Sequence, residues 1–518
     1  MSFEKKVDRK VVELLEKRGV KDIECFLFTR FECYLDPFKL PDIEKAVERV
    51  IKAIKEKEKI LIWGHDDLDG MSSAALLREA LLNLGVEKDH IFLYIPDRKE
   101  EKYGLSKNVI DRFYNQGVTM VITVDTGSSS GGEVMYAENK GLSVIITDHH
   151  EVLNPPYGAT GFVNPKRKDS IYPFRELAGV GVTLKFVSAI YKKMADITIE
   201  ELYSLKPEFF GFAALGTIAD RVPLLSENRY IVKDAMYVLS ESSYPPFKVW
   251  RKKVGLFPPL TVTEIFQKGI QYFYTAGKER GVLLLTSENE EELEKLYDEL
   301  KERIEDWNIK REKMCDYAEE SAEIYGNIVV CVDPRIEIKF LGSCAGRLRD
   351  KYSLPAFAIT VKKEKEEWVG EVRGLEGTDM LSFLKKMGYL FKDYGGHKLA
   401  AGFSIEEGNL KELLKNLEEL GEDFELPHFK KEEYEMVIPI SSLSDEMRFL
   451  LPPYGPSFPP PVFLSPCTEV YKKNGEFFAD DKKLAFSLST PQLEKFKANI
   501  IYTLDELGNI IVVYYKEV

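Results

Sequence analysis

Three short apolar runs in the first part of the chain each end abruptly in acids or histidines. The runs cover residues 60–63, 120–124 and 142–146, and helical-looking stretches separate them. This alternation is typical of βαβ units, in which helices cover both faces of a parallel sheet. Because ligands bind outside the carboxyl ends of parallel strands, we expect the polar residues after the three runs to meet in one place.

The segments at these strand ends are GHDDLDG (64–70), VDTGSSS (124–130) and TDHHE (147–151). Carboxylates crowded together repel one another, and some stay protonated unless cations neutralise them. Carboxylate and imidazole ligands without thiolates suit Mn²⁺ or Mg²⁺. Each segment alone is explained as well by a turn or a helix cap, but the three together predict a metal site.

The spacing of the acids favours two ions rather than one. Asp67 and Asp69 are two residues apart, so in extended backbone they project the same way, and His65 continues this spacing. Asp125 can then bridge the ions, and Asp220 of the GTIADRVPL segment supplies a further carboxylate. Two divalent ions about 3.5–4 Å apart bind a hydroxide and clamp a phosphoryl group. The residues therefore predict phosphoester hydrolysis.

The remainder of the chain indicates further domains. Apolar residues at three- and four-residue steps predict a long helix that runs to about Ile324, with Ser287 and Glu290 as a capping pair. A second α/β pattern follows, and the proline-rich stretch LPPYGPSFPPPVF then leads into short alternating runs typical of a small barrel. We expect an N-terminal extension packed on the first domain (1–45), an α/β domain (46–285), a connecting helix (286–325), a second α/β domain (326–426) and a β module (427–518).

Composition limits the partners and the compartment. A net charge of −14 over 518 residues argues against a surface that coats nucleic acid indiscriminately, so an anionic substrate needs a local groove. Six scattered cysteines without a C-x-x-C pair favour a reducing compartment over a disulfide framework. The chain opens with no leader-like pattern, and no apolar run approaches transmembrane length. We expect a cytoplasmic protein with no membrane partner.

These acid and histidine segments, followed far downstream by YGGHKLAAGF (394–403), resemble the DHH phosphoesterases and, more narrowly, the RecJ group of single-strand-specific exonucleases. Residues 95–105, 162–186 and 452–463 fit the same family pattern, so the likeness spans almost the whole chain. The resemblance implies a DHH catalytic domain, a DHHA1-type substrate-binding domain and an OB-like module that binds nucleic acid. It further implies a two-metal exonuclease, with Mn²⁺ favoured over Mg²⁺, that degrades single-stranded DNA from the 5′ end in repair, recombination or replication.

The resemblance also implies roles for individual residues. The metal ligands fall on His65, Asp67, Asp69, Asp125, His149 and Asp220. Asp148 would orient a histidine from behind the ligands, and His150 would face the scissile phosphate. Contacts to the substrate fall on Arg98, Lys278, Arg373, Gly395, Gly396 and His397.

Three positions depart from the family pattern. The family often has aspartate in place of His65, which bears on metal preference more than on activity. It commonly has serine where this chain has Glu371, two residues before Arg373, and arginine where this chain has Lys278. Glutamate repels a terminal phosphate, and lysine cannot make the bidentate grip of arginine. We therefore predict a weaker dependence on a 5′-phosphate than in typical relatives.

Two other functions stay open from the sequence. One is a DHH phosphodiesterase of short oligoribonucleotides or cyclic dinucleotides, although such relatives usually lack the C-terminal β module. The other is an inactive replication scaffold with a nuclease-like fold, although such proteins typically lose the acids that this chain keeps. DNA and RNA both remain candidate substrates, and docking on repair or replication proteins remains open.

Overall fold

The computed structural model describes residues 7–96, 104–362, 367–375, 377–426, 433–487, 491 and 493–518. The chain divides into two compact units. We call Met1–Lys301 with Glu432–Val518 the first unit, and Glu302–Lys431 the second unit. Within the described ranges, no helix combines the length and the apolar character that a bilayer span requires.

The first unit contains a five-stranded sheet in the order β2-β1-β3-β4-β5, and all of its strand pairs are parallel. Trp63 lies opposite Thr123 and Val124 lies opposite Thr147, so the carboxyl ends of three strands meet at one edge. The predicted parallel sheet is confirmed. Its strands are β1 (Lys59–Trp63), β2 (Ile91–Tyr94), β3 (Val118–Val124), β4 (Ser143–Thr147) and β5 (Gly161–Val163).

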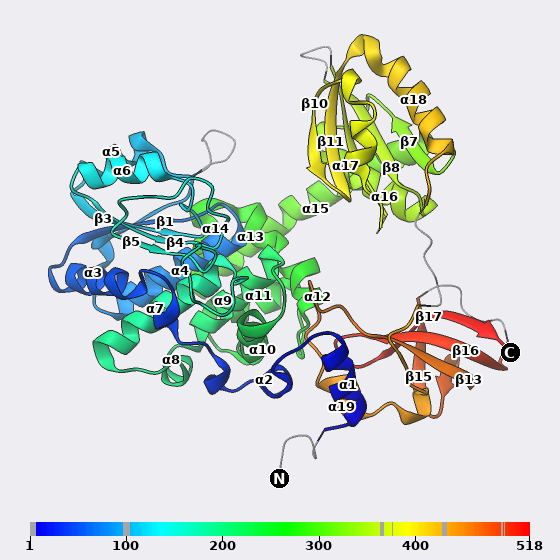
Figure 1. The fold of residues 1–518 in the computed structure, drawn as a ribbon, viewed down its shortest axis with the longest axis horizontal. Coiled ribbons are helices and arrows are strands. Elements are labelled where there is room, and N and C mark those ends of the chain that lie inside the picture. Colours follow the sequence, from blue (N-terminus) through cyan, green and yellow to red (C-terminus); the bar gives the residue numbers. More distant parts are fainter. Residues whose placement is uncertain are drawn as a thin grey trace. The chain divides into compact units, whose positions relative to one another are not determined.

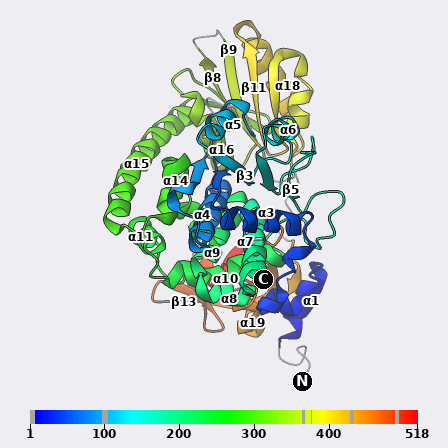
Figure 2. The ribbon, with the colours of Figure 1, turned by 90° about the vertical axis from the view of Figure 1, so that its left-hand side faces the viewer.

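Helices cover both faces of this sheet, with α5 and α6 on one face and α3, α4 and α7 on the other (Figures 1 and 2). The strands are apolar on both sides because successive side chains point to opposite faces. Leu61 and Trp63 pack with Phe113 and Val134 on the α5–α6 side. The covering helices are α3 (Ile43–Lys55), α4 (Leu68–Asn83), α5 (Lys107–Tyr114), α6 (Gly131–Asn139) and α7 (Gly179–Ala195).

A helical region completes the catalytic half of the first unit. Its helix α9 is apolar on all sides over PEFFGFAALGTI, and it is therefore buried against α4, α7 and α10. A short π-helix, η5, follows α12. The elements are α8 (Ile199–Leu205), α9 (Pro207–Asp220), α10 (Ser226–Glu241), α11 (Pro245–Val254), α12 (Val262–Glu264), η5 (Ile265–Gly269), α13 (Gln271–Ala276) and α14 (Lys278–Thr286).

The predicted long helix exists, but its ends differ from the prediction. Helix α15 spans Glu290–Glu320, and Ile324 belongs to strand β6 instead. The first turn is capped by Asn289, whose side chain accepts the Glu292 N–H at 3.2 Å, and not by Ser287. Serine and asparagine are both favoured N-cap residues, so the sequence alone predicts the start of this helix only to within one turn.

The second unit is a six-stranded mixed sheet in the order β10-β11-β9-β8-β7-β6, in which only the β7–β8 pair is parallel within the described residues. Helix α16 and the end of α15 cover one face, and α17 and α18 cover the other. The elements are β6 (Ala322–Tyr325), β7 (Ile328–Val332), α16 (Leu341–Tyr352), β8 (Ala356–Lys362), β9 (Glu367–Arg373), α17 (Met380–Lys385), β10 (Phe391–His397), β11 (Ala400–Glu406) and α18 (Leu410–Glu422).

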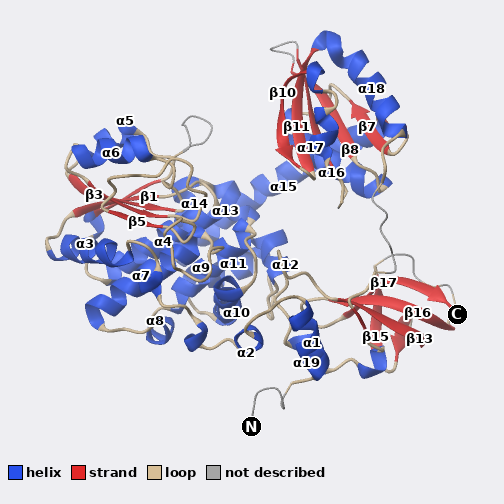
Figure 3. Ribbon diagram, viewed as in Figure 1, coloured by secondary structure: helices blue, strands red, loops and turns tan. Residues whose placement is uncertain are grey.

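The C-terminal module is a closed barrel of five strands, drawn in red in Figure 3, with pairing between β13 and β16 as the closure. The predicted OB-like barrel is confirmed. As expected, residues 451–461 contain no helix or ladder strand, and the first long strand begins at Val462. The elements are β12 (Met436–Val437), α19 (Asp445–Phe449), β13 (Val462–Lys473), β14 (Glu476–Ala479), β15 (Lys482–Phe486), β16 (Lys495–Leu504) and β17 (Ile510–Glu517).

The N-terminal extension contacts more than the domain on which we expected it to pack. Val11 and Leu14 of α1 (Arg9–Lys17) pack into the core of the C-terminal barrel. Helix α2 (Ile23–Leu27) lies where three segments meet, because Arg229 of α10 donates to the Phe26 carbonyl as well as to carbonyls of the proline-rich segment. The short helices η2 (Phe31–Cys33) and η3 (Pro37–Lys39) then lead to α3.

Cys25 and Cys33 form a disulfide, with their Cα atoms 5.8 Å apart. The sequence-based prediction of no disulfide is therefore wrong for this pair, because pairing depends on how α2 and η2 fold back, and not on a C-x-x-C spacing. Cys315, Cys331, Cys344 and Cys467 are free thiols. Disulfides form in oxidising compartments and also inside hyperthermophiles, so the cysteines no longer argue for a reducing compartment.

Reduction of the Cys25–Cys33 bond is expected to lower the free energy of unfolding by about 2–3 kcal/mol, the chain-entropy value for so short a loop. Denaturant melts with and without dithiothreitol measure this difference, and the Cys25→Ser/Cys33→Ser double variant serves as the control that dithiothreitol does not affect. A thiol titration of the unfolded, unreduced protein should find the four cysteines outside this pair. Six reactive thiols would contradict the prediction.

Candidate metal centre

His65, Asp67 and Asp69 lie where β1 turns into α4. Asp67 is the N-cap of this helix and accepts the Gly70 N–H at 2.9 Å. The sequence folds this way because aspartate is a favoured N-cap and its negative charge lies at the positive end of the helix dipole. His65 and Asp69 are almost fully buried.

Asp69 is fixed by the start of a second helix. Its two carboxylate oxygens accept the N–H groups of Gly179 and Val180 at the N-terminus of α7, both at 2.7 Å. Gly179 also makes room for the next strand end, because a Cβ atom there would lie 2.4 Å from Asp125 Oδ1. The GVG segment therefore has two functions, to hold Asp69 and to let Asp125 approach.

Asp125 and His149 come from the next two strand ends. Asp125 follows β3 with a left-handed φ of 58°, and His149 follows β4. His149 Nε2 lies 3.2 Å from Asp125 Oδ1, 3.6 Å from Asp220 Oδ2 and 3.8 Å from Asp69 Oδ2. Asp220 is the last residue of α9. Four separate elements thus deliver these side chains to one point.

The side chains form two adjacent groups with Asp125 between them. Ligand atoms of His65, Asp67 and Asp125 lie within 4.8 Å of one another, and so do those of Asp69, His149 and Asp220. His65 Nδ1 is 2.8 Å from Asp67 Oδ2 and 3.6 Å from Asp125 Oδ2. Asp125 therefore offers one oxygen to each group, as a bridging carboxylate requires.

Electrostatics indicate that this cluster needs cations. Burial, together with the nearby charges of Asp67, Asp148 and Asp220, raises the pKa of Asp125 well above its usual range. Burial and the charges of Asp125 and Asp220 raise the pKa of Asp69 in the same way. A carboxylate cluster with raised pKa values is stabilised in its charged form only when positive charge enters it.

Two buried atoms at the centre of the cluster test whether a metal fits. Asp125 Oδ1 and His149 Nε2 have no hydrogen-bond partner among the described residues. A buried polar atom without a partner is costly, and its usual explanation is an ion or water that completes its coordination. Carboxylate oxygens and imidazole nitrogens are the ligands that divalent Mn²⁺, Mg²⁺ and related ions take. The residues therefore fit divalent metal ions.

Asp148 orients the ring of His150, and from His149 it accepts only the main-chain N–H. Its Oδ1 lies 2.8 Å from His150 Nδ1, so any contact of this half-exposed ring with a substrate is made through Nε2. Burial raises the pKa of the Asp148 carboxyl, but the hydrogen bond to His150 and the charges of both histidines outweigh it and hold the pKa below its usual range. Asp148 is therefore a charged, buried anchor for the ring.

Two residues that sequence reasoning missed hold this anchor. The Ser128 N–H donates to Asp148 Oδ2 at 2.8 Å, and the buried Asn164 side chain donates to Ser128 Oγ at 2.7 Å and to the His150 carbonyl at 2.9 Å. Asn164 lies in the FVNPK segment, directly after β5. Its position at a further strand end of the same sheet is the signal that could have identified it.

Asn164→Ala is expected to lower kcat by about 10- to 100-fold, the cost of misplacing a catalytic group by roughly 1 Å. The reason is that the His150 main chain and Ser128 both lose the side chain that holds them. Metal affinity, measured by calorimetry, should stay unchanged because Asn164 contacts none of the six predicted ligands. Asn83→Ala, at an exposed position of α4, is the matched control. An equal loss of metal binding and of kcat would contradict this positioning role.

Comparison with known proteins agrees with this geometry. The model described as "DHH family, N-terminal domain" matches residues 59–217, and the "DHHA1 domain" model matches residues 326–423. The "Single-stranded-DNA-specific exonuclease RecJ" of Bacillus subtilis (strain 168) is 30% identical over 470 residues, which are 88% of this chain and 58% of that relative. This chain therefore contains a DHH domain and a DHHA1 domain, and its sequence is RecJ-like.

Solved RecJ structures share the fold of this RecJ-like chain. RecJ in complex with Mn²⁺ from Thermus thermophilus superposes with a TM-score of 0.72 at 21% identity, over 98% of this chain and 76% of that one. An exonuclease RecJ bound to manganese gives a TM-score of 0.57 at 26% identity, over 74% of this chain and 96% of that one. The chain spans little more than half the length of the Bacillus relative.

The DHHA1 domain gathers most of the predicted substrate contacts on two strands, β9 and β10, which lie on either side of β11. Arg373 of β9 and His397 of β10 both lie opposite Ala400 of β11, and Gly395 lies opposite Gly402. Gly396 has a φ of 136° and lies so close to Ala401 that a Cβ atom would clash with it. His397 is exposed. The GGH segment is thus an open strand end beside an arginine.

Arg373 points over the start of helix α16, because a Cβ atom on Gly342 would lie 2.3 Å from its guanidinium. An arginine next to a helix N-terminus is a favourable place for an anion. Glu371 competes for it, since Arg373 Nη1 donates to Glu371 Oε2 at 2.8 Å. Glu371, one of the residues that depart from the family pattern, therefore forms an ion pair with Arg373, the arginine predicted to contact the substrate.

One further predicted contact, Lys278, belongs to the first unit. Lys278 is the first residue of α14, a helix that packs so closely on α4 that a Cβ atom at Gly281 would meet Met71 Sδ. Its φ of 41° is left-handed. Arg98 falls outside the residues that the structure describes.

Proposed function

We propose that this chain is a metal-dependent exonuclease that hydrolyses single-stranded DNA from the 5′ end to nucleotides, with two divalent ions and Mn²⁺ as the preferred metal. The observation that carries this proposal is the pair of adjacent acid and histidine groups with Asp125 between them. RecJ relatives named as single-stranded-DNA-specific exonucleases support the substrate, and a similar manganese-bound RecJ supports the metal.

In this proposal one ion would be held by His65, Asp67 and Asp125, and the other by Asp69, His149 and Asp220. Asp125 Oδ1, 3.2 Å from His149 Nε2, would add a ligand to the second ion. When bound, the ions supply an activated water and neutralise charge on the phosphate under attack. His150, whose Nδ1 is held by the Asp148 carboxylate, would face the scissile phosphate with Nε2. The burial of Asp69 and Asp125 keeps the carboxylates rigid, so the site is already organised before a substrate binds.

The second unit would grip the strand through Arg373, His397 and the exposed Gly395–Gly396 backbone. Lys278 and Arg98 remain proposed contacts. The C-terminal barrel would extend the path of a long strand by stacking and charge. This barrel favours polymers over dinucleotides as substrates, and we propose a role in DNA repair, recombination or replication in the cytoplasm.

A digestion experiment tests this function. Single-stranded DNA labelled internally or at either end, carrying a 5′-phosphate or a 5′-hydroxyl, is incubated with enzyme and Mn²⁺ beside an equal RNA series. Mononucleotides released first from the 5′ end of DNA are expected. Cleavage confined to RNA or to the shortest oligomers would point to an oligoribonucleotide or cyclic-dinucleotide phosphodiesterase. No metal-dependent cleavage of any substrate would point to an inactive replication scaffold.

Glu371→Ser should make the enzyme more dependent on a 5′-phosphate. The ratio of kcat/KM for 5′-phosphorylated over 5′-hydroxyl DNA is expected to rise by about tenfold, the value of one charge-assisted hydrogen bond gained by a released Arg373. Glu367→Ser on the same strand, at a carboxylate that pairs with Lys392, is the matched control. If both variants change the ratio alike, Glu371 does not set this preference.

A further inference from the structure

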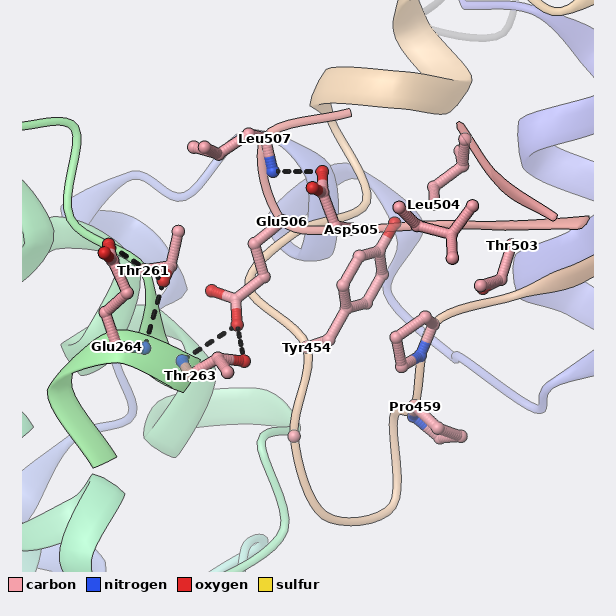
Figure 4. Close-up of a pocket in the computed structure, with 13 residues that line it drawn as sticks. Thr261, Thr263, Glu264, Tyr454, Pro459, Thr503, Leu504, Asp505, Glu506 and Leu507 are labelled. Carbon is pink, nitrogen blue, oxygen red and sulfur yellow. Dashed lines mark hydrogen bonds between the residues drawn. The ribbon is translucent and has the colours of Figure 1, made fainter. Parts of the chain in front are cut away.

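A pocket of about 590 Å³ lies between the catalytic half of the first unit and the C-terminal barrel (Figure 4). One side is formed by α12, and the other by the proline-rich segment and the turn between β16 and β17. This volume lies within the range of pockets that hold small molecules or single side chains of a partner. It shares no lining residue with the metal centre.

Apolar side chains line most of the pocket, and its charged lining residues are acidic. Its apolar lining comes from Tyr454, Pro459, Pro460, Leu504, Leu507 and Ile511. Its charged lining consists of Glu264, Asp505 and Glu506, and no lysine, arginine or histidine lines it within the described residues. Lys268, outside the lining, pairs with Glu264 at 3.2 Å. The lining stays net negative with Glu264 paired, and negative charge repels phosphate groups, so the pocket does not fit a nucleic acid strand.

Hydrogen bonds hold two of the acids in place. The Glu506 carboxylate accepts the N–H groups of Val262 and Thr263, at 2.7 and 3.0 Å, and thereby ties the barrel to the start of α12. Asp505 accepts the Leu507 and Asn509 N–H groups within its own turn, at 2.9 and 2.8 Å. A site whose charges are already fixed loses little freedom when a ligand binds.

The Tyr454 hydroxyl is a second, independent sign of a ligand. Tyr454 is 4% exposed, and its hydroxyl has no hydrogen-bond partner among the described residues. Figure 4 shows the ring of Tyr454 on the barrel side of the pocket, beside Leu504. A buried hydroxyl without a partner is costly, and a ligand that donates or accepts a hydrogen bond there removes this cost.

We propose that this pocket docks a peptide segment of a partner protein, with one large apolar side chain inside the pocket and a neighbouring lysine or arginine at the acidic rim. The apolar lining selects the buried side chain, and the three carboxylates select the basic neighbour. The acidic rim would also orient the segment, because it attracts the basic residue of the segment and repels acidic residues.

Three pentapeptide probes test the chemistry on the full chain by calorimetry: Gly-Lys-Trp-Arg-Gly, its acidic counterpart Gly-Glu-Trp-Asp-Gly, and Gly-Lys-Ala-Arg-Gly. The first peptide is expected to bind with one-to-one stoichiometry. The other two peptides should bind at least about tenfold more weakly, because the acidic peptide lacks the basic residues and the alanine peptide lacks the large apolar side chain. Equal affinity of the basic and acidic tryptophan peptides would overturn the proposal.

Matched variants locate the binding. Leu507 is 44% exposed at the rim, and Leu507→Lys places a cation beside the acids, so it should weaken the basic peptide by about tenfold. Leu205→Lys makes the same change at an exposed leucine of α8 and should leave binding unaltered. Tyr454→Phe removes only the unpaired hydroxyl and should weaken binding by about threefold. Equal effects of the two lysine variants, or competition by oligothymidylate, would also overturn the proposal.

Discussion

Asp125→Asn is expected to reduce the proposed exonuclease activity by about three orders of magnitude or more, because a ligand shared by two metal ions would support several kcal/mol of transition-state stabilisation. Asp125 is the only described residue that belongs to both the His65 group and a His149 group. Asparagine keeps the size of the side chain but loses the negative charge. Single-turnover digestion of labelled single-stranded DNA in Mn²⁺ measures the effect, and Asp316→Asn, at an exposed carboxylate of α15, is the control.

The same substitution should make the metal-free protein more stable, although it lowers activity. Burial and three neighbouring carboxylates raise the pKa of Asp125, so its charged form destabilises the metal-free fold at neutral pH. Between the ordinary carboxyl pKa and the raised one, the unfolded chain has lost the Asp125 proton and the folded chain still holds it. The free energy of unfolding therefore falls as the pH rises through this range. Metal-free Asp125→Asn should therefore unfold at a higher temperature than the wild type.

Added Mn²⁺ distinguishes a metal ligand from a merely structural residue. The wild-type protein should gain thermal stability with Mn²⁺ concentration, because the ion binds the folded state only. Asp125→Asn should lose most of this gain. A variant that is inactive but keeps the full Mn²⁺-dependent rise in melting temperature would contradict the role of Asp125 as a bridging ligand.

Arg229→Met is expected to lower the free energy of unfolding of the first unit by about 3–5 kcal/mol, the range for loss of one partner from a buried charged network. The guanidinium is fully buried and donates to the carbonyls of Phe26, Leu451, Pro452 and Pro453, at 2.7–3.1 Å. It also lies 3.7 Å over the Phe26 ring. Burial lowers its pKa to about 9, which shows that the cation is held against a desolvation cost.

Methionine would fill much of the space of Arg229 but leave these four carbonyls without donors. We expect the proline-rich segment and α2 to become accessible to protease before the catalytic sheet does. Denaturant melts and limited proteolysis measure the two effects, with Arg9→Met, whose side chain is 90% exposed, as the control. A change below about 1 kcal/mol would show that the N-terminal extension and the barrel hold together without Arg229.

The sequence alone determined the parallel sheet, the barrel and the position of the metal cluster. It could do so because these depend on local periodicity and on one rule, that the carboxyl ends of parallel strands meet at one edge. Residues 60–63, 120–124 and 142–146 all became sheet strands, and His65, Asp125 and His149 lie together. The resemblance to DHH proteins assigned the separate roles of Asp148, His149 and His150, which residue spacing did not distinguish.

Only the tertiary structure decided which distant groups meet. Asn164 and Ser128 support His150, Cys25 pairs with Cys33, and Arg229 joins three segments more than 200 residues apart in the chain. The acidic pocket at Tyr454 likewise consists of residues from both chain segments of the first unit. Such contacts leave no periodic signal, because a buried polar group selects its partner by distance and geometry after the helices and strands have packed.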